Sequence, residues 1–211
     1  MKIQILVDNI NSWIVPYAKK LEHQLKINGH IANVFHNAEQ IIEGDILCLL
    51  SCEKKVKQLN LNKYNLVVHE SYLPQGKGWS PLTWQVIEGK NKIPVTLIEA
   101  SDSIDSGQIY LQKEILLKGH ELVDELRDLQ GGATIDIIIE FITNIHSLQS
   151  KEQSGEETFY PRRIYSDSEL DINKTISDQF NLLRVVDNER YPAFFVKDGI
   201  KYKLLISKFV E

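Results

Sequence analysis

Short apolar runs separated by longer helical or polar segments constrain the fold of this 211-residue chain most strongly. Four runs of strand length lie within the first 70 residues, at 2–8, 31–35, 45–50 and 65–70. Apolar residues at helical spacing follow the first run, and shorter segments separate the others. Runs that are apolar on both faces are typical of strands covered by helices on both sides. The order therefore predicts an α/β fold with a doubly wound, mostly parallel sheet.

The middle of the chain continues the alternation of strands and helices. The predicted elements are a helix at 80–88, strands at 93–99 and 108–117, and a long helix at 122–145. Inside the long helix, Gly131 and Gly132 mark either a kink or a point of close packing. The sheet predicted from these elements is Rossmann-like.

The last third of the chain has a different character. Residues 147–158 are polar, contain a glycine and show no period, which indicates a linker. Residues 172–186 have helical spacing, and two strand-like runs flank Asp198-Gly199, a hairpin signal. We expect a Rossmann-like domain at 1–147, a linker at 148–171 and a small helix-and-hairpin subdomain at 172–211. Two roles are open for this subdomain: a contact in a homodimer, or a cap on the edge of the sheet.

Charge and composition exclude several classes of partner. The net charge is −5, spread through the sequence, so no basic field recruits phosphate backbones and we do not expect nucleic acid as a partner. The longest apolar stretch near the amino terminus, residues 3–7, has the length of a single strand. We therefore expect neither a signal peptide nor a membrane span, and a cytoplasmic location.

The sequence also lacks the usual motifs for nucleotide and metal cofactors. The turn after the first strand, residues 7–13, contains no glycine and so cannot be a phosphate-binding loop of the dinucleotide or P-loop type. Cys48 and Cys52 lie four residues apart, and the histidines are scattered. We expect reduced thiols and no metal site.

A histidine at the end of the fourth run is the first candidate for chemistry. His69 closes a buried strand and is followed by a proline-containing turn with Gly76 and Gly78. Ligands bind open α/β sheets at the carboxyl ends of the strands, so this imidazole is expected at the rim of a site. The alternative is a strand-end histidine satisfied by backbone groups. Asp105, in the turn at 101–107, becomes a candidate when it is paired with His69.

Two motifs around these residues are specific in combination. They are VVHESYLP at 67–74, with Gly76 and Gly78 behind it, and DSG at 105–107, which places His69 and Asp105 36 residues apart. The pair resembles the formyltransferase family that uses 10-formyltetrahydrofolate, whose signature is Asn-x-His-x-x-x-Leu-Pro, a glycine and a later Asp-x-Gly. The resemblance implies the Rossmann-like formyltransferase fold, a folate co-substrate and no metal.

The resemblance extends beyond the linker and suggests an acceptor. Residues 160–171 and 183–194 are similar to the segment that follows the catalytic domain in sugar-nucleotide N-formyltransferases. The sequence of residues 69–84 looks most like that of small bacterial enzymes that formylate a UDP-linked 4-amino sugar, a step in making formamido derivatives of pseudaminic acid. It is also similar to the formylation domain of linear gramicidin synthetase. The resemblance therefore implies a nucleotide-linked amino sugar, such as a UDP-4-amino-4,6-dideoxy sugar, as acceptor.

Other functions remain open at this stage. Formylation of an amino acid or of a peptide-synthetase-type acceptor is one, and a purine precursor is disfavoured because a glycine-rich first loop is absent. Initiator transfer RNA is not expected, because the chain ends after one hairpin and is acidic. From another class, the chain can be a catalytically weak folate- or nucleotide-binding relative, or a Rossmann-like protein in which the two motifs coincide by chance.

The resemblance implies catalytic roles for two residues and raises a question about a third. In the family mechanism the histidine polarises the formyl oxygen and shuttles protons, and the aspartate holds the histidine and relays protons. His69 and Asp105 take these roles. The family's asparagine donates to the oxyanion, and Val67 stands in its place. Loss of one oxyanion donor typically costs about 3 kcal/mol in transition-state stabilisation.

Three explanations of Val67 stay open. A backbone N–H or Gln85 can replace the donor, or a protonated His69 paired with Asp105 can act alone, or the protein is an impaired relative. Asn65 lies on the same strand face, but two residues of a strand span about 6.6 Å. We therefore do not expect Asn65 to substitute, and we predict an active enzyme with His69 as its main electrophile.

The resemblance also implies which residues bind the two substrates. The folate positions are Ser51, Cys52, Glu53, Lys54, Lys55, Val56, Ser101, Asp102, Ser103 and Ile104. A solvated helix start is the alternative for 51–56, where two lysines suit the glutamate tail. The sugar-nucleotide positions are Asn9, Gly78, Trp79, Arg162, Arg163, Arg184 and Tyr191. Arginines bind anions and aromatic faces stack on rings, but each arginine can instead be ion-paired at the surface, and Asn9 can be a cap.

Overall fold

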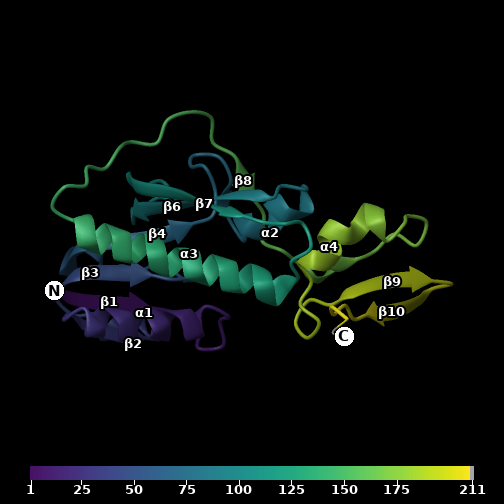
Figure 1. Cartoon of the computed structure of the whole chain (residues 1–211), viewed down its shortest axis with the longest axis horizontal. Helices are drawn as coiled ribbons and strands as arrows, with labels where there is room; N and C mark the ends of the chain where they lie inside the picture. Colours follow the sequence, from purple (N-terminus) through teal and green to yellow (C-terminus); the bar gives the residue numbers. More distant parts are fainter. Residues whose placement is uncertain (210–211) are drawn as a thin grey trace.

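The computed structural model describes residues 1–209 and is built around a six-stranded sheet (Figure 1). In spatial order the strands are β2 Ile31–Phe35, β1 Lys2–Leu6, β3 Gly44–Leu49, β4 Asn62–His69, β6 Lys92–Glu99 and β7 Ile109–Leu116. The pairings from β2 to β4 are parallel, whereas β6 pairs antiparallel with both β4 and β7. The predicted α/β class with a Rossmann-like, mostly parallel sheet is confirmed, with β6 running opposite to its neighbours β4 and β7.

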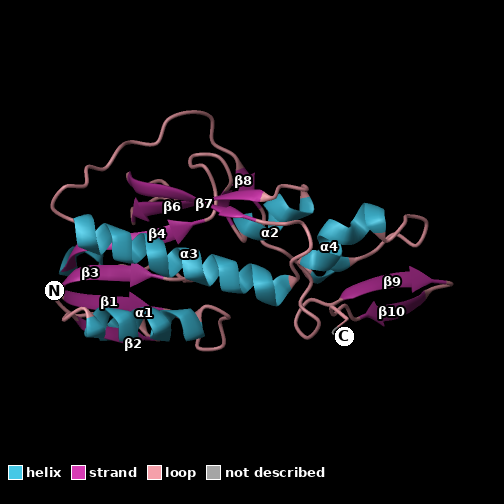
Figure 2. Cartoon of the chain, viewed as in Figure 1, coloured by secondary structure: helices cyan, strands magenta, loops and turns pink. Residues whose placement is uncertain are grey.

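Two long helices cover one face of the sheet. Helices α1 Val15–Ile27 and α3 Val123–Asn144 contact each other and pack on the main core (Figure 2). The other face is covered by short 3-10 turns, η1 Ala38–Gln40 and η2 Leu59–Leu61, around Ile41. The connections after β2 and β3 thus each contain a single 3-10 turn in place of an α-helix.

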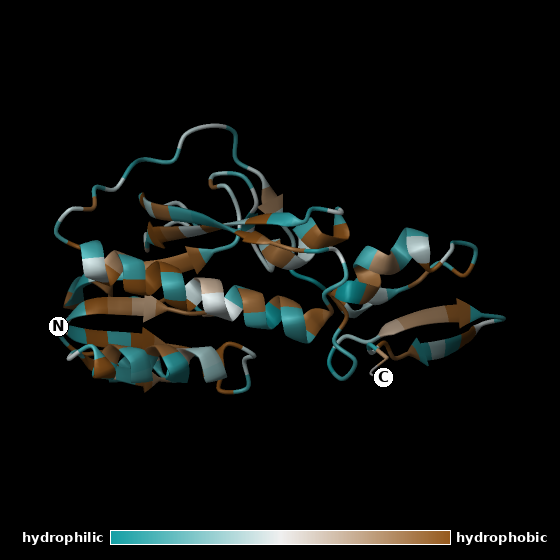
Figure 3. Cartoon of the chain, viewed as in Figure 1, coloured by the Kyte–Doolittle hydropathy of each residue, from teal (hydrophilic) through white to brown (hydrophobic). Residues whose placement is uncertain are grey.

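Hydropathy follows this layering. In Figure 3 strands β1 and β3 are largely brown, and the connection that leaves the end of α3 is largely teal. The buried side chains of β1, including Ile3 and Ile5, are fully excluded from solvent. No helix in the described part of the chain is long and apolar enough to cross a bilayer.

The two glycines of α3 have different surroundings. The helix runs without interruption through both of them, so neither marks a break. A Cβ atom on Gly131 would lie 2.2 Å from the ring of Tyr17 on α1, whereas one on Gly132 would meet open space. Of the two predicted explanations, close packing is therefore correct, and it applies to Gly131.

The segment after α3 is attached to the sheet rather than free. Lys151 exchanges two backbone hydrogen bonds with Ile109 at the start of β7, at 2.8 and 2.9 Å. Strand β8 Phe159–Tyr160 then pairs in parallel with β5 Lys77–Gly78, in the turn after β4. The predicted linker therefore returns along the sheet edge to the carboxyl end of β4. The division of the chain into domains stays a prediction.

The C-terminal region forms a separate cluster at one end of the molecule (Figure 1). The predicted hairpin is confirmed as β9 Ala193–Lys197 and β10 Ile200–Leu204. The helix predicted at 172–186 is mostly wrong, since only a 3-10 turn and α4 Phe180–Arg184 are helical. Asp171 accepts a hydrogen bond from the Asn173 N–H, and this local turn replaces the first helical turns.

We predict opposite effects for alanine at the two neighbouring glycines. Gly131→Ala should lower the free energy of unfolding by about 1–3 kcal/mol, because its methyl group must displace Tyr17. Gly132→Ala should raise the free energy of unfolding by about 0.5–1 kcal/mol, because alanine favours the helix and has room. Urea denaturation of both variants checks this, and the same sign for both would contradict the packing.

Candidate active site

A large cavity opens at the carboxyl ends of β3 and β4. Its volume is about 770 Å³, within the range typical of small-molecule sites. The residues named from the sequence as site candidates all line it except Arg184. Folding thus brings together side chains from the first strand turn, the loops after β3, β4 and β6, and the segments around 162 and 190.

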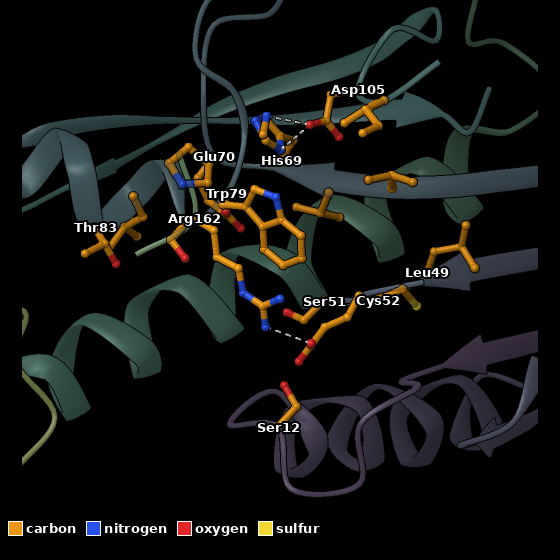
Figure 4. Close-up of a pocket in the computed structure, with 18 of the residues that line it drawn as sticks. Ser12, Leu49, Ser51, Cys52, His69, Glu70, Trp79, Thr83, Asp105 and Arg162 are labelled. Carbon is orange, nitrogen blue, oxygen red and sulfur yellow. Dashed lines mark hydrogen bonds and ion pairs between the residues drawn. The ribbon is translucent and has the colours of Figure 1, made fainter. Parts of the chain in front are cut away.

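His69 is the last residue of β4 and lies at the back of this cavity (Figure 4). Its ring is 5% exposed, and Nε2 lies 2.7 Å from the carbonyl oxygen of Gly76. A carbonyl only accepts, so Nε2 carries a hydrogen and donates it. The other nitrogen, Nδ1, lies 3.6 Å from Oδ2 of Asp105, which is an ion-pair distance when the ring is protonated. Nδ1 is therefore the atom left for proton exchange.

Asp105 is held in place by contacts from two distant segments. Its backbone is left-handed (φ 49°), and its Oδ2 accepts the Gly78 N–H at 2.9 Å. Gln153 donates to the backbone carbonyl of Asp105 at 2.8 Å. A Cβ on Gly107 would lie 1.6 Å from the Glu99 carbonyl oxygen, so this position admits only glycine. The carboxylate is thus aimed by β5 and by the segment after α3.

Lys77 completes the support of this turn. Its side chain is 1% exposed, and Nζ donates to Ser106 at 2.7 Å and to Glu157 at 2.5 Å. A buried ammonium group needs such partners, because an unpaired one would be strongly destabilising. Lys77 therefore connects β5, the Asp105 turn and the segment after α3.

The structure narrows the explanations of Val67. Val67 lines the cavity and packs in a small apolar cluster with Ile98. Gln85 cannot replace the missing donor: its amide nitrogen donates to the carbonyls of Glu70 and Pro81, at 2.5 and 3.1 Å, and it does not line the cavity. Asn65 is occupied in the same way, with its amide on Glu99 at 3.2 Å. A backbone N–H or His69 itself remains as the oxyanion donor, and the explanation as an impaired relative also stays open.

The two segments named for folate binding face each other across the cavity. Lys55 Nζ lies 3.0 Å from Oδ1 of Asp102, which joins the loop after β3 to the loop after β6. The N–H groups of Glu53 and Lys54 donate to the Asp8 carboxylate at 2.9–3.1 Å. The loop at 51–56 is therefore an irregular turn tied to the end of β1, and the alternative of a helix start is wrong.

Trp79 and Arg162 form an aromatic and cationic wall of the cavity. Trp79 is 38% exposed, and the guanidinium of Arg162 lies 4.6 Å from its ring centroid (Figure 4). Arg162 also pairs with Glu53 at 3.1 Å, and Asn9 donates to the same carboxylate at 3.1 Å. Asn9 therefore holds this wall rather than capping α1, which begins without a side-chain cap.

Two cavity arginines were missed in the sequence analysis. Arg127 of α3 and Arg190 line the cavity next to Arg163 and Tyr191. Arg127 pairs with Asp187 at 2.8 Å, and this bond and backbone N–H groups outweigh burial to lower the pKa of Asp187. Arg190 directly precedes Tyr191, which the sequence named as a sugar-nucleotide position, so Arg190 could have been found from its neighbour. Arg127 gave no such signal, because the other residues of α3 are typical of a helix that packs on the core.

Arg163 is anchored in the protein while it borders the cavity. Its guanidinium donates to the carbonyl of Val185 at 3.2 Å and to Ser168 at 3.0 Å. Burial lowers the pKa of Arg163, and its Nε has no hydrogen-bond partner. The side chain thus fixes the segment around 163 and keeps one donor unused.

Arg184, named from the sequence as a sugar-nucleotide position, lies in a different environment. It does not line the cavity, and its side chain is 1% exposed beside α3. Its guanidinium pairs with Glu121 at 3.0 Å, which is itself 7% exposed. Burial would raise the pKa of Glu121, but backbone N–H groups of Lys118 and Gly119 and the charge of Arg184 lower it to about 2. Arg184 thus anchors α4 to the loop that leads into the start of α3.

The cysteines and acidic residues do not form a metal site in the described residues. No group of three metal-ligating side chains is present within residues 1–209. Burial raises the pKa of Cys48 and Cys52 to about 12. Both therefore stay protonated near neutral pH, although Cys52 lines the cavity.

The chain belongs to the formyl transferase family, whose sequence profile matches residues 24–131, slightly more than half of its length. The methionyl-tRNA formyltransferase of Ehrlichia canis (strain Jake) is 26% identical over 178 residues, which cover 81% of this chain and 57% of that protein. That of Thermodesulfovibrio yellowstonii is 30% identical over 60% of this chain and 42% of that protein. The chain spans about half the length of these curated relatives.

Solved structures share the whole fold. A methionyl-tRNA formyltransferase from Clostridium thermocellum has a TM-score of 0.82 at 20% identity, covering 100% of this chain and 94% of that chain. A 4-N formyltransferase from Francisella tularensis has 0.73 at 17%, covering 99% and 98%. HypX from Aquifex aeolicus, in complex with tetrahydrofolic acid, has 0.79 at 16%, covering 95% and 36%. At these identities the likeness shows the fold alone.

We predict that Arg184 acts on stability. Arg184→Met should lower the free energy of unfolding by about 3–5 kcal/mol, because Glu121 is then left buried and charged without its partner. Adding Glu121→Gln should recover part of this loss, since no charge remains buried. Urea denaturation at pH 7 measures both, and a single-variant loss under about 1 kcal/mol would contradict the buried pair.

Proposed function

We propose that this protein is an N-formyltransferase that moves a formyl group from 10-formyltetrahydrofolate to the amine of a nucleotide-linked amino sugar. The observation that carries the proposal is the His69–Asp105 pair, 3.6 Å apart at the back of a ligand-sized cavity. Membership in the formyl transferase family supports the reaction class. A cytoplasmic location and a homodimer, predicted from the sequence, remain predictions.

The folate side of the cavity fits its co-substrate. Apolar side chains including Leu49, Val67 and Ile98 line it and suit a flat ring system. Lys54 and Lys55 lie at its edge, where they suit the carboxylates of a glutamate tail. Bound there, 10-formyltetrahydrofolate supplies the one-carbon group, and no metal is needed.

Proton handling falls to His69 and Asp105. The Gly76 carbonyl fixes the ring through Nε2, so the Nδ1 side faces Asp105. In this proposal the protonated ring stabilises the developing oxyanion where the family uses its asparagine, and the carboxylate stabilises the charged ring. The same proton then goes to the nitrogen that leaves. Val67 contributes shape only, which makes the enzyme more dependent on His69.

The acceptor side fits an anionic, ring-bearing molecule. Arg127, Arg162, Arg163 and Arg190 line it, facing the acidic Glu53 and Asp187. Arginine forks suit a diphosphate, and Trp79 offers an aromatic face for a base or sugar. These features support a nucleotide-linked amino sugar such as a UDP-4-amino-4,6-dideoxy sugar, of the kind used toward pseudaminic acid derivatives.

Methionyl-tRNA is the second candidate acceptor, because the curated relatives carry that name. Against it stands the charge of −5, which favours small anions in a cationic pocket over a nucleic acid surface. An amino acid or peptide-synthetase-type amine is a further alternative. A weak folate- or nucleotide-binding relative is the alternative without turnover.

We predict formyl transfer that depends on both motif residues. The protein is incubated with 10-formyltetrahydrofolate and UDP- and dTDP-linked 3-amino and 4-amino sugars, methionyl-tRNA and free amino acids, and products are weighed by mass spectrometry. One nucleotide sugar should gain about 28 Da, the mass of one formyl group in exchange for hydrogen. His69→Ala and Asp105→Asn should each lower the rate about 100-fold or more.

Asp105→Asn is a fair test because asparagine tolerates the left-handed backbone and still accepts the Gly78 N–H. A product on methionyl-tRNA alone would replace the sugar acceptor by the second candidate. Wild-type turnover in His69→Ala would overturn the catalytic assignment. Folate binding without any product would support the non-catalytic relative.

A further inference from the structure

Glu70 is a buried carboxyl group without a role in the reaction proposed above. It follows His69 directly, lines the cavity and is 8% exposed. Within residues 1–209 no cationic side chain forms an ion pair with it. Burial raises the pKa of this carboxyl group. Buried carboxylates normally have a charged partner, so a cavity position without one suits a cation that arrives with a ligand.

Glu70 stands directly after the end of β4, whose last side chains alternate between the two faces of the sheet. Successive side chains of a strand point to opposite faces. Val67 packs in the small cluster with β6 and β7, whereas Val68 packs on the main core with α1 and α3. His69, the last residue of β4, continues the side of Val67, and Glu70 follows directly after the strand. In Figure 4 Glu70 lies on the side of His69 away from Asp105.

The groups that face Glu70 come from four elements. His69, at the end of β4, lowers the pKa of Glu70, and Asp105, in the turn after β6, raises it. From α3 the amide of Gln130 hydrogen-bonds to the carboxyl group and lowers its pKa. From α2 Pro81–Ile87, Gln85 donates to the backbone carbonyl of Glu70 and contributes no charge. Within residues 1–209 Glu70 therefore has one titratable base beside it, His69, and no ion-pair partner.

Arg127 is an anion-binding side chain on the helix that packs beside Glu70. It lies three residues before Gln130 on α3, hence on the same helix face, and both line the cavity. An acceptor whose phosphates reach the arginine wall and whose reacting end reaches His69 shares the cavity with Glu70, the residue next to His69. An amine is the cationic group that such an acceptor carries.

We propose that Glu70 binds the ammonium group of the acceptor and removes its proton before formyl transfer. The inference rests on the proposed function and adds a second catalytic residue to it. It assigns the two protonation tasks to different residues: Glu70 prepares the nucleophile, and His69 with Asp105 handles the formyl oxygen and the leaving nitrogen.

The protons balance over one turnover. One N–H bond of the ammonium breaks and one O–H bond forms on Glu70, which frees the lone pair for attack on the formyl carbon. As the new C–N bond forms and the bond from carbon to the folate nitrogen breaks, the second proton passes through His69 to the folate nitrogen. Glu70 releases its proton to solvent with the product, so one proton appears per formyl group transferred.

The test is the pH profile of kcat/KM for formylation of a UDP-4-amino sugar by wild type and Glu70→Gln. The variant should be about 100-fold or more slower at pH 6.5, because only amine already free in solution can react. The deficit should narrow to less than about tenfold at pH 9, where the acceptor arrives deprotonated. Parallel profiles over this range would overturn the proposal.

Glu99→Gln is the matched control. Glu99 is also a carboxyl group whose pKa burial raises, but it does not line the cavity and holds Asn65 and Tyr110 instead. Its variant should keep the shape of the wild-type pH profile. A narrowing deficit in both variants would assign the effect to general loss of a buried carboxylate and would also overturn the proposal.

A second measurement uses wild type alone and does not depend on how Glu70→Gln folds. Calorimetric titration at pH 6.5 compares the UDP-4-amino sugar with the same sugar bearing a hydroxyl group at that carbon. A carboxylate facing the ammonium should favour the amine about tenfold or more. Equal binding overturns the role of Glu70. If wild type binds the amine selectively but forms no product, the proposed transfer fails while the ammonium site stands.

Discussion

The buried ammonium group of Lys77 is the interaction on which the candidate site depends. It ties β5, the Asp105 turn and the segment after α3 to one another through Ser106 and Glu157. The next residue, Gly78, donates directly to the Asp105 carboxylate. The position of Asp105 relative to His69 is therefore set by chain segments some 50 to 80 residues apart, and not by the turn alone.

Sequence reasoning worked where function and local structure coincide. His69 was predictable because it ends an apolar strand before a glycine-containing turn, and Asp105 because its motif stands at the family spacing. Residues whose role depends on tertiary placement were not. Glu70 and Arg127 stand among residues typical of a strand end and a helix, and only packing of α3 against the end of β4 brings them to one cavity. Arg184 shows the converse, since its motif position gave no sign of Glu121.

The fold shows the same division. Strands and long helices followed from their apolar periods, and so did the hairpin, which depends on the local Asp198-Gly199 turn. The region at 172–186 did not, because a helical spacing of apolar residues there reflects packing on a small separate cluster, with a polar turn at Asp171 interrupting the helix. The role of Gly131 needed the position of Tyr17, which no local pattern contains.

The cavity separates two chemical environments around one imidazole: an apolar side with two lysines at its edge, and a cationic wall with a tryptophan. That tryptophan has a practical consequence. The chain has three tryptophans, of which Trp13 and Trp79 line the cavity, and Trp79 carries a guanidinium over its ring. Two of the three tryptophans thus border the cavity, so we expect ligand binding to change the intrinsic fluorescence of the protein, without a label and before any turnover.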